Sequence, residues 1–165
     1  MAVRVLVAFA TKMGSTGEIA ESVAGTLRAG GLEAAALAAR DITDLAPYDA
    51  VILGSALYAA HWQREANRFV ARNREALAAR PLWLFSSGPL DRRLAAQDLP
   101  LTEHAAEIFL DLTWRGHRTF GGRLDPTSPA VDPQILATHP IGDFRDWAAI
   151  HDWAASIARE LLAEG

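Results

Sequence analysis

The sequence predicts an α/β fold, in which helices cover both faces of a parallel β-sheet. Strand-like and helix-like segments alternate along the 165 residues, as the right-handed crossovers of parallel sheets require. Several strand-like segments are short and almost wholly apolar, which is typical of strands that are buried on both faces. Half of the residues are hydrophobic, so the chain can bury a sizeable core. We therefore expect residues 1–165 to form a single domain.

A strand, a turn and a helix open the chain. Residues 3–9 are apolar and rich in valine except at Arg4, and this pattern predicts a buried strand. Residues 11–17 have the residue types of turns and helix N-caps. A helix is expected next, because apolar residues recur every four positions before two glycines end the pattern. These apolar residues are Ile19, Val23 and Leu27.

Two further strands and a second helix are expected in the following segment. Residues 33–39 are a weak strand, because alanine dominates them and mainly their place in the alternation supports the assignment. Residues 49–55 repeat the buried-strand pattern and end in small residues. Residues 62–77 carry one apolar stripe at helical spacing, with arginines mainly elsewhere, so we expect an amphipathic helix.

The second half of the chain continues the alternation. Residues 81–88 are another apolar strand, in which Pro81 occupies the first position, where a missing ladder donor matters least. Residues 101–114 predict a helix with Thr102 as its N-cap. Residues 117–124 predict the last strand.

The final forty residues contain an irregular segment and a helix. Residues 125–140 carry prolines at positions 126, 129, 133 and 140, and we expect no regular structure there. The closing helix has an apolar face from Trp147 to Leu161, and we expect Asp143 to be its N-cap.

Composition excludes several function classes. The formal net charge is −4, with 16 Lys+Arg and 20 Asp+Glu, so no nucleic-acid footprint is expected. The absence of cysteine excludes disulfides, thiolate metal sites and a cysteine nucleophile. The five histidines are scattered, and we expect no metal site. No apolar stretch approaches the roughly 20 residues of a membrane span, and no signal peptide is recognisable. We expect a cytoplasmic protein without a transmembrane segment.

Ligands of open α/β sheets bind beyond the carboxyl ends of the strands, which makes three loops candidates. In the first, residues 10–17, Thr11, Ser15 and Thr16 supply hydroxyl groups and Gly14 allows a tight turn. The following helix start adds free N–H groups and a partial positive charge, so a phosphate monoester fits this loop. The alternative is that Ser15 or Thr16 simply caps the helix.

The other two loops have features that suit a flat ring. Residues 54–61 are small and then aromatic, so backbone amides can approach the edge of a planar ligand, and Tyr58 or Trp62 can stack on its face. The alternative for Trp62 is packing under the next helix. Residues 86–92 offer hydroxyl and backbone donors for the polar edge of such a ring.

Other well-known signatures are missing from these loops. The chain has no GxxxxGK[ST], GxGxxG or GxSxG sequence at the expected places, which argues against P-loop enzymes, dinucleotide-binding proteins and α/β-hydrolases. A receiver domain needs aspartates where residues 9–11 and 54–55 have none.

Taken together, the three loops resemble the layout of flavodoxins. The spacing Thr11-x-x-Gly14-x-Thr16 resembles the flavodoxin phosphate signature, and Ser15 stands where many members carry asparagine. Four segments are also similar to the flavodoxin-domain group that includes menaquinone-dependent protoporphyrinogen dehydrogenase. They are residues 9–20, 54–58, 83–89 and 142–147.

The resemblance implies a flavodoxin-like, doubly wound sheet of five parallel strands in the order 2-1-3-4-5, in three layers, with FMN bound noncovalently. Because the flavin ring carries the electron chemistry, the resemblance implies no catalytic side chain. The implied FMN-binding residues are Thr11, Lys12, Met13, Gly14, Ser15, Thr16 and Gly17 at the phosphate, Ser55, Ala56, Leu57 and Tyr58 beside the isoalloxazine, and Ser86, Ser87, Gly88, Pro89 and Asp91 at its polar side.

Two departures from simple flavodoxins favour an enzyme. Residues 86–92 contain no aromatic residue to cover a second ring face, and a net charge of −4 is mild for a shuttle steered to basic partners. We therefore expect an FMN-dependent oxidoreductase that passes electrons between a small reduced substrate, such as a protoporphyrinogen, and a quinone or other acceptor. The alternatives are a non-catalytic electron carrier or redox module, and a flavodoxin-like binding protein that has lost FMN.

Overall fold

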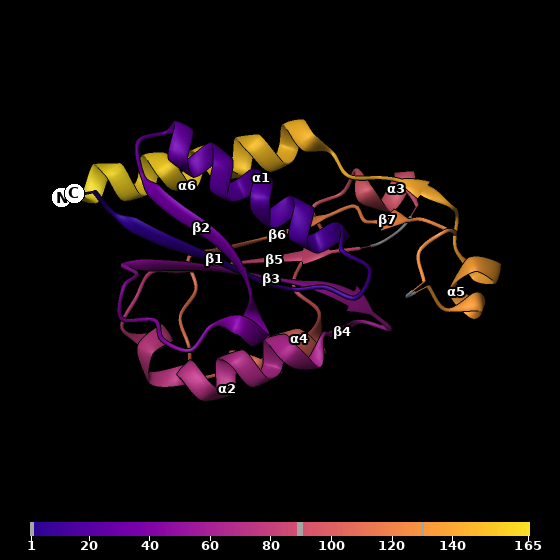
Figure 1. Cartoon of the computed structure of the whole chain (residues 1–165), viewed down its shortest axis with the longest axis horizontal. Coiled ribbons are helices and arrows are strands. Elements are labelled where there is room, and N and C mark those ends of the chain that lie inside the picture. The colour runs from indigo at the N-terminus through magenta and orange to yellow at the C-terminus, as the bar shows by residue number, and fades with distance from the viewer. Residues whose placement is uncertain (1, 89–90, 130) are drawn as a thin grey trace.

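A parallel sheet forms the middle layer of the computed structural model, which describes residues 2–88, 91–129 and 131–165 (Figure 1). Its strands follow the order β2-β1-β3-β5-β6. When the parallel strands of the described residues are counted along the chain, this order is 2-1-3-4-5, as predicted. The strands are β1 (Arg4–Ala10), β2 (Glu33–Ala38), β3 (Ala50–Tyr58), β5 (Leu82–Ser87) and β6 (Gly116–Phe120).

Helices cover both faces of the sheet, which confirms the three predicted layers (Figure 1). On one face lie α1 (Ser15–Ala29) and α6 (Trp147–Glu164), and on the other lie α2 (Arg64–Ala78) and α4 (Glu103–Ile108). Successive β1 residues point to opposite faces. Accordingly, Val5 and Val7 pack with α1 and α6, whereas Leu6 and Ala8 belong to the core under α2. This double burial explains the continuous apolar runs of the central strands.

The helix predicted over residues 101–114 is shorter than its pattern suggested. It covers only Glu103–Ile108, although Thr102 caps it as predicted by accepting a hydrogen bond from the Ala105 amide at 3.3 Å. Phe109 is fully buried and Leu112 is 7% exposed, and both pack in the core under α2. The chain leaves the helix in a turn that places these side chains in the core, so tertiary packing overrides the local periodicity.

The predicted cap of the last helix was wrong by three residues. Asp146, and not Asp143, accepts a hydrogen bond from the Ala149 amide at 3.0 Å. Asp143 lies in the short strand β8 (Gly142–Asp143), where its carboxylate binds Arg145. The Asp143 carboxylate, which the sequence pattern selected as the cap, therefore forms an ion pair with Arg145 instead.

The segment before α6 has more regular structure than predicted. The strand expected over residues 117–124 ends at Phe120, and β7 (Arg123–Leu124) pairs with β8 in a separate two-stranded sheet. Between them, a Cβ on Gly121 would lie 2.0 Å from the Phe144 carbonyl oxygen, so only glycine permits this approach. Shorter helical segments are η1 (Ala39–Asp41), α3 (Arg92–Ala95) and α5 (Pro133–Thr138), and α5 falls inside the stretch that was expected to be irregular.

The structure bears on two features of the chain, membrane-spanning helices and metal-binding clusters. No helix of the described residues is long and apolar enough to cross a membrane. Among the same residues, no group of three or more His, Asp or Glu side chains is arranged to hold a metal ion.

Candidate functional site

The turn that joins β1 to α1 lies at the carboxyl edge of the sheet. Gly14, the residue before α1, has φ 91° and ψ −16°, in the left-handed region that favours glycine. No side chain caps the helix there, so neither Ser15 nor Thr16 acts as the N-cap. A Cβ on Gly14 would meet no atom within 4 Å, which leaves open space beside the helix start.

Hydrogen-bond donors gather without partners at this turn. The first turn of any helix leaves its N–H groups without intrahelical acceptors, and the amides of Ser15, Thr16 and Gly17 have no acceptor within the part of the chain that the structure describes. Thr16 is 0% exposed, and its hydroxyl is likewise without a partner among the described residues. A buried hydroxyl left unpaired costs about 1–3 kcal/mol. These donors match the acceptor oxygens of a phosphate.

One hydroxyl of the turn is already engaged. The Thr11 Oγ1 atom accepts a hydrogen bond from the Gly14 amide at 2.9 Å. Because Thr16 is completely buried, an external acceptor reaches its hydroxyl only after its side chain rotates or the turn shifts. The donor set of the turn therefore fits a phosphate, although the Thr16 hydroxyl is not accessible from outside in this conformation.

Ion pairs tie the first turn of α1 to the segment before α6. Arg145 Nη1 lies 2.7 Å from Glu18 Oε2 and 3.3 Å from the Ser15 carbonyl oxygen, and its Nη2 lies 2.7 Å from Asp143 Oδ2. Arg123 Nη1 lies 3.5 Å from the other Glu18 oxygen. Sequence reasoning did not select Arg145, which is 130 residues from Ser15. The one hint in the sequence was that Arg145 lies in residues 142–147, one of the segments that resemble the flavodoxin-domain group.

The second predicted loop is a β-hairpin. β3 continues to Tyr58 and turns through Ala59 and Ala60 into β4 (His61–Trp62). Both alanines have left-handed φ values, 50° and 64°, as the tight turns of two-residue hairpins require. A hydrogen bond from Thr102 Oγ1 to the Ala60 carbonyl at 2.8 Å fixes the hairpin against α4. This contact supports a backbone conformation that costs roughly 1–2 kcal/mol per alanine.

The residues predicted in this second loop have different environments. Ser55 is fully buried, and its hydroxyl accepts from the Gln63 amide at 2.8 Å and donates to the Ala56 carbonyl at 3.0 Å. Leu57 and Tyr58 are half-buried. The Lys12 ammonium lies 4.7 Å from the centre of the Tyr58 ring, so the first and second loops are in contact. Burial raises the pKa of the Tyr58 phenol, which keeps it neutral near pH 7.

The third loop is anchored by a buried polar network. The Ser86 hydroxyl accepts from the Trp62 indole N–H at 3.0 Å and lies 3.0 Å from His117 Nε2. Burial lowers the pKa of His117 to about 4, against a weaker opposing effect of Asp98, so the imidazole is neutral near pH 7. Trp62 is 4% exposed and packs edge-on against Phe109. It therefore belongs to the core, as its alternative interpretation proposed.

The remaining residues of the third loop lie at the end of β5. Ser87 is 5% exposed, and the Gly88 amide donates to the Phe120 carbonyl at 3.0 Å. Asp91 caps α3 by accepting from the Leu94 amide at 2.8 Å. Pro89 lies outside the described residues. The hydroxyls of Ser55 and Ser86 are thus engaged by groups of the fold itself.

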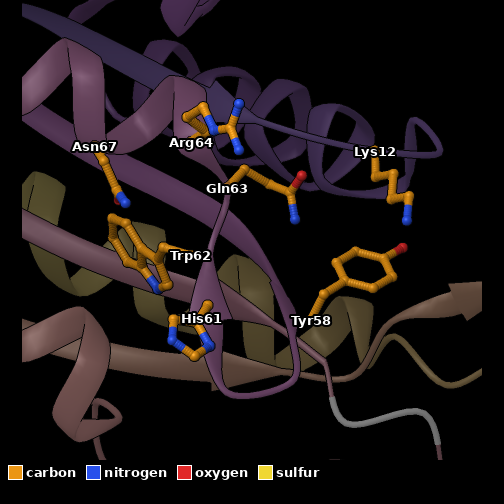
Figure 2. Close-up of a pocket in the computed structure, with 7 residues that line it drawn as sticks. All are labelled: Lys12, Tyr58, His61, Trp62, Gln63, Arg64 and Asn67. Carbon is orange, nitrogen blue, oxygen red and sulfur yellow. The ribbon is translucent and has the colours of Figure 1, made fainter.

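A cavity of about 450 Å³ lies between the first loop, the hairpin and the start of α2 (Figure 2). Figure 2 shows the Lys12 side chain directed at the Tyr58 ring on one side of it and Trp62 on the other. Two lining residues, Lys12 and Arg64, are cations that form no ion pair with any described residue, and no carboxylate lines the cavity. The lining residues are Lys12, Tyr58, His61, Trp62, Gln63, Arg64 and Asn67.

The three-layer fold, with the parallel strand order β2-β1-β3-β5-β6 and unpartnered donors at the turn after β1, is flavodoxin-like. Residues 6–128 match the flavodoxin domain family, and the chain belongs to that family. No curated protein sequence gives a significant match.

Solved structures share the fold at low sequence identity. An archaeal flavodoxin is 13% identical, with a TM-score of 0.63 over 96% of this chain and 98% of that one. Oxidised flavodoxin 1 from Bacillus cereus is 16% identical, with a TM-score of 0.63 over 94% and 97%. The rubredoxin oxygen:oxidoreductase of Desulfovibrio gigas is 15% identical, with a TM-score of 0.66 over 97% of this chain but 36% of the larger protein.

Proposed function

We propose that the chain binds FMN noncovalently, with the phosphate in the turn at residues 11–17. The observation that carries this proposal is the buried, unpartnered hydroxyl of Thr16 beside three amides without acceptors. A phosphate dianion supplies enough acceptors for all of these groups, and the partial positive charge of a helix start favours it. Lys12, which forms no ion pair among the described residues, adds a positive charge to the same turn.

The isoalloxazine ring would then lie between the second and third loops. Because the hydroxyls of Ser55 and Ser86 are engaged in the fold, we assign the ring contacts to other groups. These are the side chains of Leu57 and Tyr58 and the backbone of residues 55–58 and 86–88. Tyr58 offers an aromatic face, and the Lys12 ammonium lies against its ring.

We further propose that the protein is an FMN-dependent oxidoreductase. Bound FMN supplies the ability to accept and release electrons, and the chain's residues bind and orient it. The cavity beside Lys12 and Tyr58 supports a small molecule as electron donor or acceptor, with a volume within the usual range of ligand sites. A protoporphyrinogen-like donor with a quinone acceptor is the narrower form of this proposal, and it rests on the sequence motifs alone.

Each alternative function has an observation in its favour. The likeness to flavodoxins over 94–98% of both chains supports an electron carrier without a substrate of its own. The hydrogen bond from Gly14 to Thr11 and the complete burial of Thr16 support a binding protein that has lost FMN.

Absorbance spectra of the purified full-length chain, before and after addition of FMN, test the cofactor proposal. A flavin spectrum that persists after gel filtration is expected, and a colourless protein after FMN addition would contradict it. Anaerobic turnover with protoporphyrinogen and menadione then tests the enzyme proposal. Reversible reduction of the flavin without any turnover would favour the carrier instead.

A further inference from the structure

Arg145 is a buried cation that reaches the proposed phosphate turn from the far end of the sequence. Its side chain is only 3% exposed, although it carries a full charge. The guanidinium binds Glu18, Asp143 and the Ser15 carbonyl, and it lies 4.7 Å from the centre of the Trp147 ring. Hydrogen bonds to the two carboxylates, Asp143 first, raise the pKa of Arg145. The guanidinium is therefore charged near pH 7.

One consequence of this arrangement is electrostatic. Glu18 is a carboxylate in the first turn of α1, close to the place where the phosphate dianion would bind. An unpaired carboxylate there repels a dianion, because like charges disfavour each other at short range. Arg145 at 2.7 Å and Arg123 at 3.5 Å compensate the Glu18 charge. Of the two, Arg145 is the more buried, and its pairing is therefore less screened by solvent.

The second consequence concerns one peptide group. The Ser15 carbonyl, which accepts from Arg145 at 3.3 Å, and the Thr16 amide belong to the same peptide plane. A charged donor at the oxygen polarises that group, so its N–H becomes a stronger donor to an acceptor on the other side. The same contact fixes the orientation of the Thr16 amide. Arg145 thus acts on the turn without facing the ligand.

We propose that Arg145 is a positioning residue that makes the turn selective for a flavin with a phosphate over a flavin without one. The inference rests on the proposed binding of FMN. The proposal explains why a buried arginine from the segment before α6 binds Glu18 and the Ser15 carbonyl. It also gives the β7–β8 pair a role, because Asp143 of β8 holds this arginine.

Dissociation constants of FMN and riboflavin for the full-length chain test the proposal. Arg145→Gln should weaken FMN binding about ten- to thirtyfold, the upper range for a partly buried charge at a helix end, and riboflavin binding less than about threefold. Adding Glu18→Gln to this variant should restore part of the FMN affinity, because one carboxylate beside the turn is then gone, whereas the effect of Arg145 on the Ser15 peptide stays lost. Arg123→Gln is the matched control: it pairs with the same Glu18 but has no bond to Ser15, so a change below about threefold is expected.

A merely structural Arg145 would give other results. Equal weakening of both flavins, or no recovery with Glu18→Gln, would overturn the proposal while leaving FMN binding intact. Failure of the unaltered chain to bind FMN would instead overturn the proposed function, and the inference with it. If Arg145→Gln does not fold, Arg145→Lys keeps the charge and should retain the preference for FMN. Titration of the unaltered and variant chains with inorganic phosphate, followed at the amide resonances of residues 15–17, gives a readout that does not depend on the ring.

Discussion

Replacing Thr16 by valine should stabilise the flavin-free protein and weaken FMN binding at the same time. Valine has nearly the same shape but no hydroxyl, and the Thr16 hydroxyl is buried without a partner in the described part of the chain. Removing an unsatisfied hydroxyl should raise the free energy of unfolding by about 1–2 kcal/mol. For a chain of this size, each kcal/mol raises the melting temperature by about 2–4 °C. The loss of a hydrogen bond to a charged phosphate should cost about 1.5–3 kcal/mol of binding free energy, or about ten- to 150-fold in affinity.

Urea unfolding with and without FMN, together with fluorescence titration of FMN, measures both effects. Thr26→Val is the matched control on the same helix, because the Thr26 hydroxyl donates to the Ser22 carbonyl at 3.0 Å and lies away from the turn. It should leave FMN affinity unchanged. Unchanged FMN affinity in Thr16→Val would refute the phosphate-turn assignment. A loss of stability in the flavin-free variant would show that the hydroxyl is satisfied in solution.

Three further predictions concern the turn and the buried network. Gly14→Ala, at φ 91°, should cost about 1–2 kcal/mol of unfolding free energy and weaken FMN binding; Gly31→Ala, at φ 101° in open space, should show a similar stability loss in urea without any effect on FMN. Burial lowers the pKa of His117 from about 6.5 in the unfolded chain to about 4 in the folded protein. As the pH falls from 6.5 toward 4, the unfolded chain binds a proton that the folded protein does not, so the free energy of unfolding decreases over this range and is unaffected by His117 above it. The loss should be at most about 3 kcal/mol, and urea titrations of His117→Gln should lack it. Ser86→Ala leaves the buried Trp62 indole N–H without its acceptor and should cost about 1–3 kcal/mol in urea unfolding, with altered tryptophan fluorescence.

The central strands and the position of the candidate site could be predicted because their signals are local. A strand covered on both faces is apolar along most of its length, as residues 5–9 and 50–53 are. The donors at residues 11–17 follow directly from a short turn between a strand and a helix. The strand order was implied by the resemblance to flavodoxins, and the structure has that order.

Other features could not be predicted, because distant residues decide them. The hydroxyls of Ser55 and Ser86 were expected near a ligand, but the Gln63 amide and the Trp62 indole occupy them. Asp143 has the residue type of a helix cap, but its carboxylate binds Arg145, which the fold also brings to Glu18 and Ser15 much earlier in the chain. In each case a polar group pairs with a group that folding brings near. The residue types around it in the sequence do not predict which group that is.

The sequence by itself determined the layers and a turn rich in donors, because burial on a fixed period and the chemistry of short turns are properties of neighbouring residues. The strand order was implied by the resemblance to flavodoxins. Tertiary structure alone decided which of those donors stay free. Long-range contacts fill the hydroxyls of Ser55 and Ser86, leave that of Thr16 without a partner in the described chain, and bring Arg145 to Ser15 across 130 positions. The physical reason is that most buried polar groups pair with a group that is near in space, and the fold, not the separation along the sequence, decides which groups are near.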